Sequence, residues 1–256
     1  MMNKNQNNYV QLANTFWGNK GQQRAFPRNI EQAILWNFPV AIINLPRLGL
    51  SSIKRWLETR NISMPFVGKD RRIRACLLAR CGHGLIFLDG TDPDDERRFS
   101  LAHEIAHYIL DYHIKRQKII KHFGNIIIDV LDGKREATIE ERLNGIFSGI
   151  TVGPFMHLMD RNEQGHVSNQ YILNSEAATE LFALELIAPR KVLEHYLDKD
   201  FPGWYKEQIH AKYAELAASI FGIPQRILVE YISYLAHLRR PSQSFKDWLG
   251  WPQSKS

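Results

Sequence analysis

The sequence predicts an α+β domain that is mostly helical and contains a small antiparallel or mixed sheet. Short apolar runs bounded by turn residues predict strands at 40–45, 74–80 and 84–89. Stretches with apolar residues three or four positions apart predict helices before and after these strands. With 256 residues, of which 44% are hydrophobic, the chain can bury one sizeable core and carry a helical appendage.

The predicted elements before residue 90 follow one another closely. Residues 30–38 have helical periodicity, 40–45 form a strand, and 51–60 form a second helix that begins at a pair of serines. Residues 74–80 and 84–89 form a hairpin around Cys81-Gly82-His83-Gly84. A few strands therefore precede the helix that carries the most informative motif.

That motif consists of two histidines four positions apart, His103 and His107, with Glu104 beside the first. On a helix, positions i and i+4 share one face, so both imidazoles can bind a single cation. Zinc held by neutral nitrogens lowers the pKa of its water to about 7, and an adjacent carboxylate can accept the water proton. The spacing is typical of zinc peptidases, with two histidine ligands and a glutamate as general base.

The flanking residues predict that the motif lies on a buried helix. Asp92 is the candidate N-cap, Pro93 takes the first helical position, and acidic residues follow at the positive end of the helix dipole. Apolar residues occupy most of the remaining circumference, which is typical of a buried helix. We therefore expect the histidines to face inward or into a cleft.

The third metal ligand has two candidate sources. His113 has the spacing of the longer metzincin signature, but Leu110 stands where that signature has the glycine that turns the backbone. On an unbroken helix His113 points away from His107. Asp111, one turn after His107, is better placed to orient a ligand than to bind metal. The other source is a carboxylate on a later helix, within residues 175–189.

The run from Arg97 to Tyr108, followed by a Glu-rich helix that ends at Pro189, resembles the ImmA/IrrE family of metallo-endopeptidases, over about residues 30–235. The resemblance implies a zincin-like metalloprotease domain with one Zn²⁺ per chain, with Mn²⁺ as an alternative. It also implies that Glu176, thirteen positions before the proline, completes the metal site. Relatives cleave or relieve transcriptional repressors, so the implied partner is a repressor-type DNA-binding regulator.

The chain departs from the family's pattern at Glu180, where relatives usually carry Asn or Asp. This leaves the role of Glu180 open, although a carboxylate there can hydrogen-bond a ligating histidine and fix its tautomer.

A second departure is the long segment between the two metal-binding motifs. We expect a helical insert at about 112–172, made of two or three amphipathic helices and including the apolar stretch 154–159. Within it, His157 and His166 are expected to be scaffold or surface residues rather than ligands.

Two features of the predicted hairpin have alternative interpretations. Residues 85–88 either pair with an extended substrate as an added strand or form a plain core strand. Cys76 and Cys81, the only cysteines, lie close to His83, but three crowded donors fall short of a closed tetrahedral set, so we expect reduced thiols.

The chain is expected to have three parts. Residues 1–20 form a polar N-terminal segment with a frayed head, and residues 21–197 form the peptidase domain. Residues 198–256 form a helical region that resembles a helix-turn-helix. Its second helix, within 225–238, is rich in apolar residues, so it is expected to pack rather than read DNA.

Composition limits the class of protein. The net charge of +6 is spread over several short basic clusters, so solvated faces are expected and autonomous DNA binding is not favoured. No apolar stretch has the roughly 18 residues of a membrane span, and the first residues lack the apolar core of a signal peptide. We expect a cytoplasmic protein.

Two functions of different classes fit these observations. The first is a zinc-dependent endopeptidase that uses His103, His107 and Glu176 as metal ligands and Glu104 as the base. The alternative is a non-catalytic regulatory or interaction protein with a structural zinc site and a helix-turn-helix-like tail. Glu104 argues against the alternative, because a closed structural site has no use for a base.

Overall fold

The computed structural model describes residues 4–18, 25–62, 69–147, 154–160, 170–206 and 210–239. The chain divides into two compact units, Met1–Pro189 and Arg190–Ser256. The first unit is α+β with a zincin-like arrangement, as the sequence predicts, and holds every strand in the described ranges. No helix in those ranges is both long enough and apolar enough to cross a membrane.

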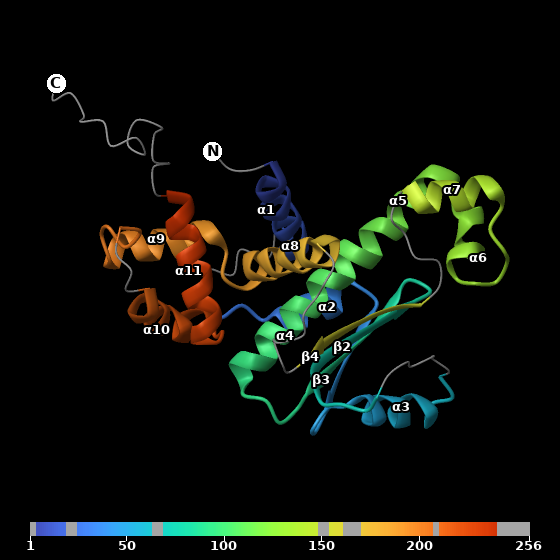
Figure 1. Ribbon diagram of the computed structural model, residues 1–256, viewed down its shortest axis with the longest axis horizontal. Coiled ribbons are helices and arrows are strands. Elements are labelled where there is room, and N and C mark those ends of the chain that lie inside the picture. Colours follow the sequence, from blue (N-terminus) through green and yellow to red (C-terminus); the bar gives the residue numbers. More distant parts are fainter. Residues whose placement is uncertain are drawn as a thin grey trace. The chain divides into compact units, whose positions relative to one another are not determined.

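A mixed sheet forms the centre of the first unit (Figure 1). Its described strands are β1 (Val40–Leu45), β2 (Ile73–Arg80), β3 (His83–Asp89) and β4 (Phe155–Asp160), in the order β1-β3-β2-β4. β1 runs parallel to β3, whereas β2 is antiparallel to both β3 and β4. The predicted hairpin is confirmed. Cys81 and Gly82 at its tip have φ angles of 52° and 82°, the left-handed values that a two-residue type I′ turn requires.

Strand β4 corrects the expectation that residues 154–159 belong to a helical insert. The segment pairs with β2, in a register that places Cys76 opposite Leu158 and Leu77 opposite His157. Leu158 packs into the core on one face of the sheet, so His157, the next residue along the strand, faces the other side. An unbroken apolar run does not distinguish a strand from a helix, and the pairing partner lies far away in the sequence.

Strand β3 settles the two interpretations of residues 85–88. Both edges of β3 are already paired, one with β1 and one with β2. It therefore cannot accept a substrate as an added strand, and the core-strand interpretation is the correct one.

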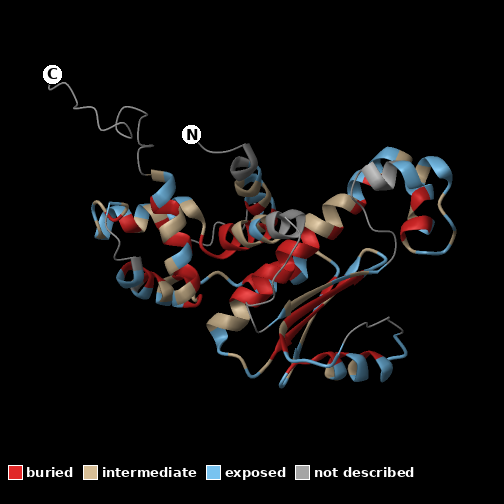
Figure 2. Ribbon diagram, in the orientation of Figure 1, coloured by how far each residue is buried: buried red, intermediate tan, exposed pale blue. Residues whose placement is uncertain are grey.

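Helices cover both faces of the sheet (Figure 1). α3 (Leu50–Glu58) packs on one face, where Ile53 and Leu57 join Cys76 and Phe87 in a buried cluster. The opposite face carries α4 (Asp94–His107), and α8 (Gln170–Ile187) packs against α4. Figure 2 shows that α4 and the sheet strands are buried along much of their length. The metal-binding motif is therefore held between the sheet and a second helix.

The N-terminal segment is helical rather than frayed over residues 4–17, contrary to the expectation. α1 (Lys4–Trp17) packs against α8, and the Trp17 indole Nε1 donates a hydrogen bond to the Leu186 carbonyl at 3.1 Å. Ala13 and Phe16 are buried. The polar average of the segment conceals this apolar stripe, which needs α8 for its burial. α2 (Ile30–Asn37) follows where a helix is predicted.

The long segment after α4 forms a small helical subdomain. A π-helical turn (Tyr108–His113) leads into α5 (Ile114–Phe123), then a 3-10 turn (Asn125–Ile127), α6 (Ile128–Leu131) and α7 (Ile139–Phe147). Its own core consists of Ile119, Ile127, Val130 and Leu131. Its outer surface is largely exposed (Figure 2).

The second unit contains α9 (Arg190–Asp200), α10 (His210–Phe221) and α11 (Gln225–Arg239). α10 and α11 form the predicted helix-turn-helix, with Gly222 at the bend in a left-handed conformation, φ 62°. The apolar face of α11 is buried at Ile227, Leu228, Tyr231 and Ile232. The second helix therefore packs inside its own unit, as expected, rather than presenting those residues for base contacts.

Candidate metal centre

Helix α4 carries the HExxH motif on its buried side. The helix begins at Asp94 with Pro93 in the N-cap position, one residue later than predicted, so Asp92 does not cap it. Acidic residues still occupy the first turn, where they interact favourably with the helix dipole. The exposed fractions of His103, Glu104 and His107 are 7%, 0% and 2%, so the expected inward orientation is correct.

Three side chains from two helices converge at one point. The Nε2 atoms of His103 and His107 lie 3.1 Å apart. The Oε2 atom of Glu176, on α8, lies 3.4 Å from each of these nitrogens. The structure therefore places the three sequence-predicted ligands together, with Glu176 reaching the pair from a helix more than sixty positions away in the sequence.

A fourth side chain, expected from the sequence to be a scaffold or surface residue, also joins this group. His157 on β4 has its Nε2 3.5 Å from Glu176 Oε1, and its ring stacks on the His107 ring with centroids 3.7 Å apart. One donor atom from each of His103, His107, His157 and Glu176 lies within 4.8 Å of the others. His157 therefore stands among the candidate donors, and the expectation that it is a scaffold or surface residue rather than a ligand stays a prediction. The sequence contained a weak signal, a histidine in an apolar run of strand length.

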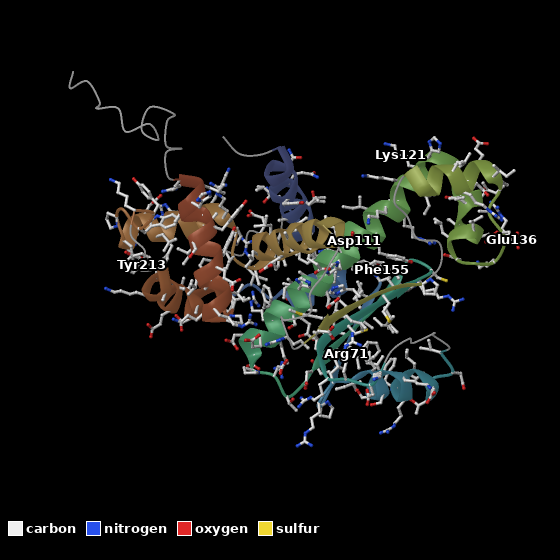
Figure 3. All side chains as sticks on the ribbon, in the orientation of Figure 1. Arg71, Asp111, Lys121, Glu136, Phe155 and Tyr213 are labelled. Atoms are coloured by element: carbon white, nitrogen blue, oxygen red, sulfur yellow. The ribbon has the colours of Figure 1, made fainter. Side chains whose placement is uncertain are left out.

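A carboxylate flanks His107 on the side away from the cluster. Asp111 Oδ2 lies 2.9 Å from His107 Nδ1, and its Oδ1 accepts a hydrogen bond from Lys115 Nζ, also at 2.9 Å. Because a carboxylate can only accept, His107 donates through Nδ1 and leaves Nε2 with a lone pair directed at the centre. Figure 3 shows Asp111 on the helical side of this region and Phe155, at the start of β4, on the sheet side.

Glu104 faces the same centre from α4. Both of its carboxylate oxygens lie close to His157 Nδ1, at 3.1 Å and 3.0 Å. The structure thus places the candidate base beside the predicted ligands, with its carboxylate engaged by a histidine from the sheet.

The π-helical turn after His107 fastens the motif to the β2–β3 hairpin. The Tyr108 hydroxyl donates to the Gly82 carbonyl at 2.8 Å, and the Tyr112 hydroxyl accepts from the Gly82 amide at 2.6 Å. Gly84 lets this contact form, because a Cβ at that position would lie 3.0 Å from the Tyr108 ring. π-helical turns are rare and frequently occur at functional sites.

The carboxylates of the cluster favour the protonated form of two of its histidines, His107 and His157. Burial lowers the pKa of His157, but the carboxylates of Glu104 and Glu176 more than offset this and raise it to about 10. Burial also opposes ionisation of Glu176, yet its contacts with the three histidines hold its pKa well below the usual range. The pKa of His107 is raised, because Asp111 and Glu176 outweigh the opposing effect of burial. The pKa of His103 is lowered, mainly by burial.

The donor set fits a divalent cation. Tetrahedral zinc, with bonds of about 2.0–2.2 Å to nitrogen and oxygen, places its ligand atoms about 3.3 Å apart. The three donor separations among His103, His107 and Glu176, from 3.1 to 3.4 Å, agree with that value. Imidazole and carboxylate donors suit zinc, and they also suit manganese. The spacing of His103, His107 and Glu176 therefore fits a single metal ion.

The remaining candidates lie outside the cluster. His113 is half-buried against the rings of Phe38 and Tyr108, as expected for a non-ligand. Glu180 is half-buried one turn after Glu176, and its role stays open. Cys76 is buried in the sheet core while Cys81 is exposed at the hairpin tip, so the two cysteines do not form a metal site. His166 lies outside the described residues.

A comparison with known families supports this description. The sequence model of the IrrE N-terminal-like domain, peptidase family M78, matches residues 63–163. Residues 63–163 are therefore similar to the IrrE N-terminal-like family. The match includes the HExxH helix and strand β4, but it ends before Glu176. A comparison with curated proteins finds no match.

Similarity to the IrrE N-terminal-like family suggests a metallopeptidase type of function, in keeping with the histidine and glutamate cluster. The ligand role of Glu176 depends on the geometry described above and on the earlier resemblance, because the matched segment does not reach it. The roles of the individual site residues stay predictions.

Proposed function

We propose that this chain is a zinc-dependent endopeptidase. The observation that carries the proposal is the convergence of His103, His107 and Glu176 at 3.1 to 3.4 Å beside the fully buried Glu104, in a segment of a peptidase family. The two histidines and Glu176 would hold the metal. A bound zinc ion would act as a Lewis acid toward water and toward a peptide carbonyl.

The protein's own contribution to hydrolysis centres on Glu104. Its carboxylate would accept the proton of the attacking water and then deliver it to the departing amine nitrogen. Burial between α4 and β4 keeps bulk water away from this carboxylate and fixes its direction. Asp111 holds the tautomer and orientation of His107.

The substrate we propose is a repressor-type DNA-binding regulator with an exposed scissile loop. Support comes from the ImmA/IrrE resemblance, since relatives of that family cleave or relieve transcriptional repressors. A regulator bound to DNA would meet the enzyme in the cytoplasm. The basic clusters on the chain would aid its approach to nucleic acid through long-range attraction.

The test is to replace Glu104 by Gln. The Glu104→Gln protein should keep one zinc per chain, because Glu104 is not a ligand, and its cleavage of a DNA-binding regulator should fall at least about 10²-fold, because proton transfer is lost. Zinc is measured by atomic emission and cleavage by mass spectrometry of the products. Glu140→Gln, on α7, is the matched control and should cleave normally. Cleavage that survives in Glu104→Gln excludes this mechanism.

A second candidate is the non-catalytic interaction protein with a structural zinc. The observation that favours it is the presence of four protein donors, His157 included, since structural zinc sites are closed by four protein ligands. The Glu104→Gln experiment separates the two functions. Salt-sensitive DNA binding that persists after the metal is removed with a chelator would favour the interaction protein.

A further inference from the structure

Strand β4 delivers His157 to the face of the sheet that carries the metal-binding helix. In the antiparallel register with β2, His157 stands opposite Leu77, and its neighbour Leu158 packs into the core on the far face. Among the described strands, β4 pairs only with β2. Backbone pairing with β2 therefore fixes the position of the His157 imidazole. The strand that carries it, β4, lies at one edge of the described sheet.

The two ring nitrogens of His157 have different surroundings. Nδ1 lies 3.0 and 3.1 Å from the two oxygens of Glu104, and a carboxylate there accepts a hydrogen bond from this nitrogen. Nε2 is then the nitrogen that can offer a lone pair once a cation displaces its proton, and it lies on the side of the cluster, 3.5 Å from Glu176 Oε1. Metal-binding histidines characteristically donate their other ring N–H to a carboxylate.

His107 has the same arrangement, with Nδ1 beside Asp111 and Nε2 in the cluster. The two rings are stacked, with centroids 3.7 Å apart and planes 25° apart. Two histidines thus present equivalent nitrogens side by side, each supported by its own carboxylate.

We propose that His157 is a fourth protein ligand of the cation and that it closes the site when the cation is bound. The consequence for catalysis rests on the proposed function: with the fourth position taken by His157 and the Glu104 carboxylate held by its Nδ1, the peptidase is latent. Movement of the edge strand β4 would release both groups together. Binding of the regulator along this edge is the kind of event that would move it.

The experiment uses the full chain loaded with cobalt(II), whose visible spectrum reports the ligand set. In the wild type, added thiocyanate should leave the spectrum unchanged, because no coordination position of the cobalt is free. In His157→Ala, thiocyanate should bind and change the spectrum, and the cobalt affinity should fall at least about tenfold. His157→Phe, which keeps an aromatic ring against His107 but has no donor nitrogen, should behave like His157→Ala.

Met156→Ala is the matched control, since Met156 lies on the same strand and its side chain points to the opposite face. It should keep the wild-type spectrum and affinity. If His157→Ala and His157→Phe also keep them, His157 is not a ligand and the proposal is overturned.

A peptidase assay on unfolded casein, run with the same proteins, keeps the two proposals distinguishable. Faster cleavage by His157→Ala than by wild type supports latency. A changed spectrum without cleavage by any variant supports the coordination by His157 and counts against the endopeptidase function. Cleavage by these proteins with an unchanged spectrum supports the endopeptidase function and counts against coordination by His157.

Discussion

At the scale of single residues, the site is a group of ionisable side chains that pair with one another, although His103 Nδ1 is buried without a hydrogen-bond partner. Glu104 faces His157, Asp111 faces His107, and Glu176 lies between the histidines. Buried charges are costly unless they are paired or bind metal. The half-exposed Glu176, with 37% of its side chain accessible, is the ligand that solvent reaches most easily.

Replacing Glu176 by Ala should weaken metal binding, because it removes the one carboxylate of the donor group and leaves only neutral imidazoles. We expect the zinc content of Glu176→Ala to fall from one per chain to well below one after dialysis, whereas Glu104→Gln keeps its zinc. Atomic emission on the two purified proteins measures the difference. Full zinc occupancy in Glu176→Ala would remove this residue from the ligand set.

At the scale of elements, α7 shows how a short helix begins without a large core. Thr138 and Glu141 form a capping box: the Thr138 amide donates to Glu141 Oε2 at 2.7 Å, and the Glu141 amide donates to Thr138 Oγ1 at 3.3 Å. Arg135 binds the same carboxylate through both terminal nitrogens. The start of α7 therefore depends on an ionised Glu141.

The stability of α7 should consequently depend on pH. The hydrogen bond from Arg135, followed by that from the Thr138 amide, lowers the pKa of Glu141 from 4.5 to about 2 in the folded state. A lowered folded pKa stabilises the fold above the unfolded value, so the contribution is complete above about pH 4.5 and is lost as the pH falls toward 2. Hydrogen-exchange protection of the α7 amides, corrected for intrinsic rates, should decrease across this window. In Glu141→Gln the same protection should not change there.

At the scale of the whole molecule, the centre joins elements that are far apart in sequence. His103 and His107 come from α4, His157 from β4 and Glu176 from α8. A cation bound by all three elements closes two long segments of chain at once, which restricts the unfolded ensemble. Metal binding should therefore be coupled to the stability of the first unit.

Removing the metal with a chelator should lower the melting temperature of the wild type. A free ion at 100 times its Kd contributes about 2.7 kcal/mol to the free energy of unfolding. The Glu176→Ala protein should show little response to the chelator, because it has little metal to lose. Differential scanning calorimetry makes both measurements. An unchanged wild-type melting temperature, with the metal demonstrably removed, would contradict the coupling.

Local patterns were enough to predict the hairpin, the strand at Val40–Leu45, the helix-turn-helix of the second unit and the buried HExxH helix. Each of these depends on neighbours within a few positions: turn residues for the hairpin, apolar spacing for the helices, and the i, i+4 geometry for the two histidines. Glu176 needed the family resemblance, because a lone glutamate on a helix carries no local sign that it binds metal.

Tertiary structure alone decided the identity of β4, the burial of α1 and the place of His157. An apolar segment becomes an edge strand only when a distant strand offers its backbone groups, and a histidine becomes a candidate ligand only when that pairing brings it to the other donors. The sequence by itself determined the chemistry available, two imidazoles with a neighbouring carboxylate. Long-range strand pairing and helix packing decided which other side chains surround them, because those contacts are not encoded in local spacing.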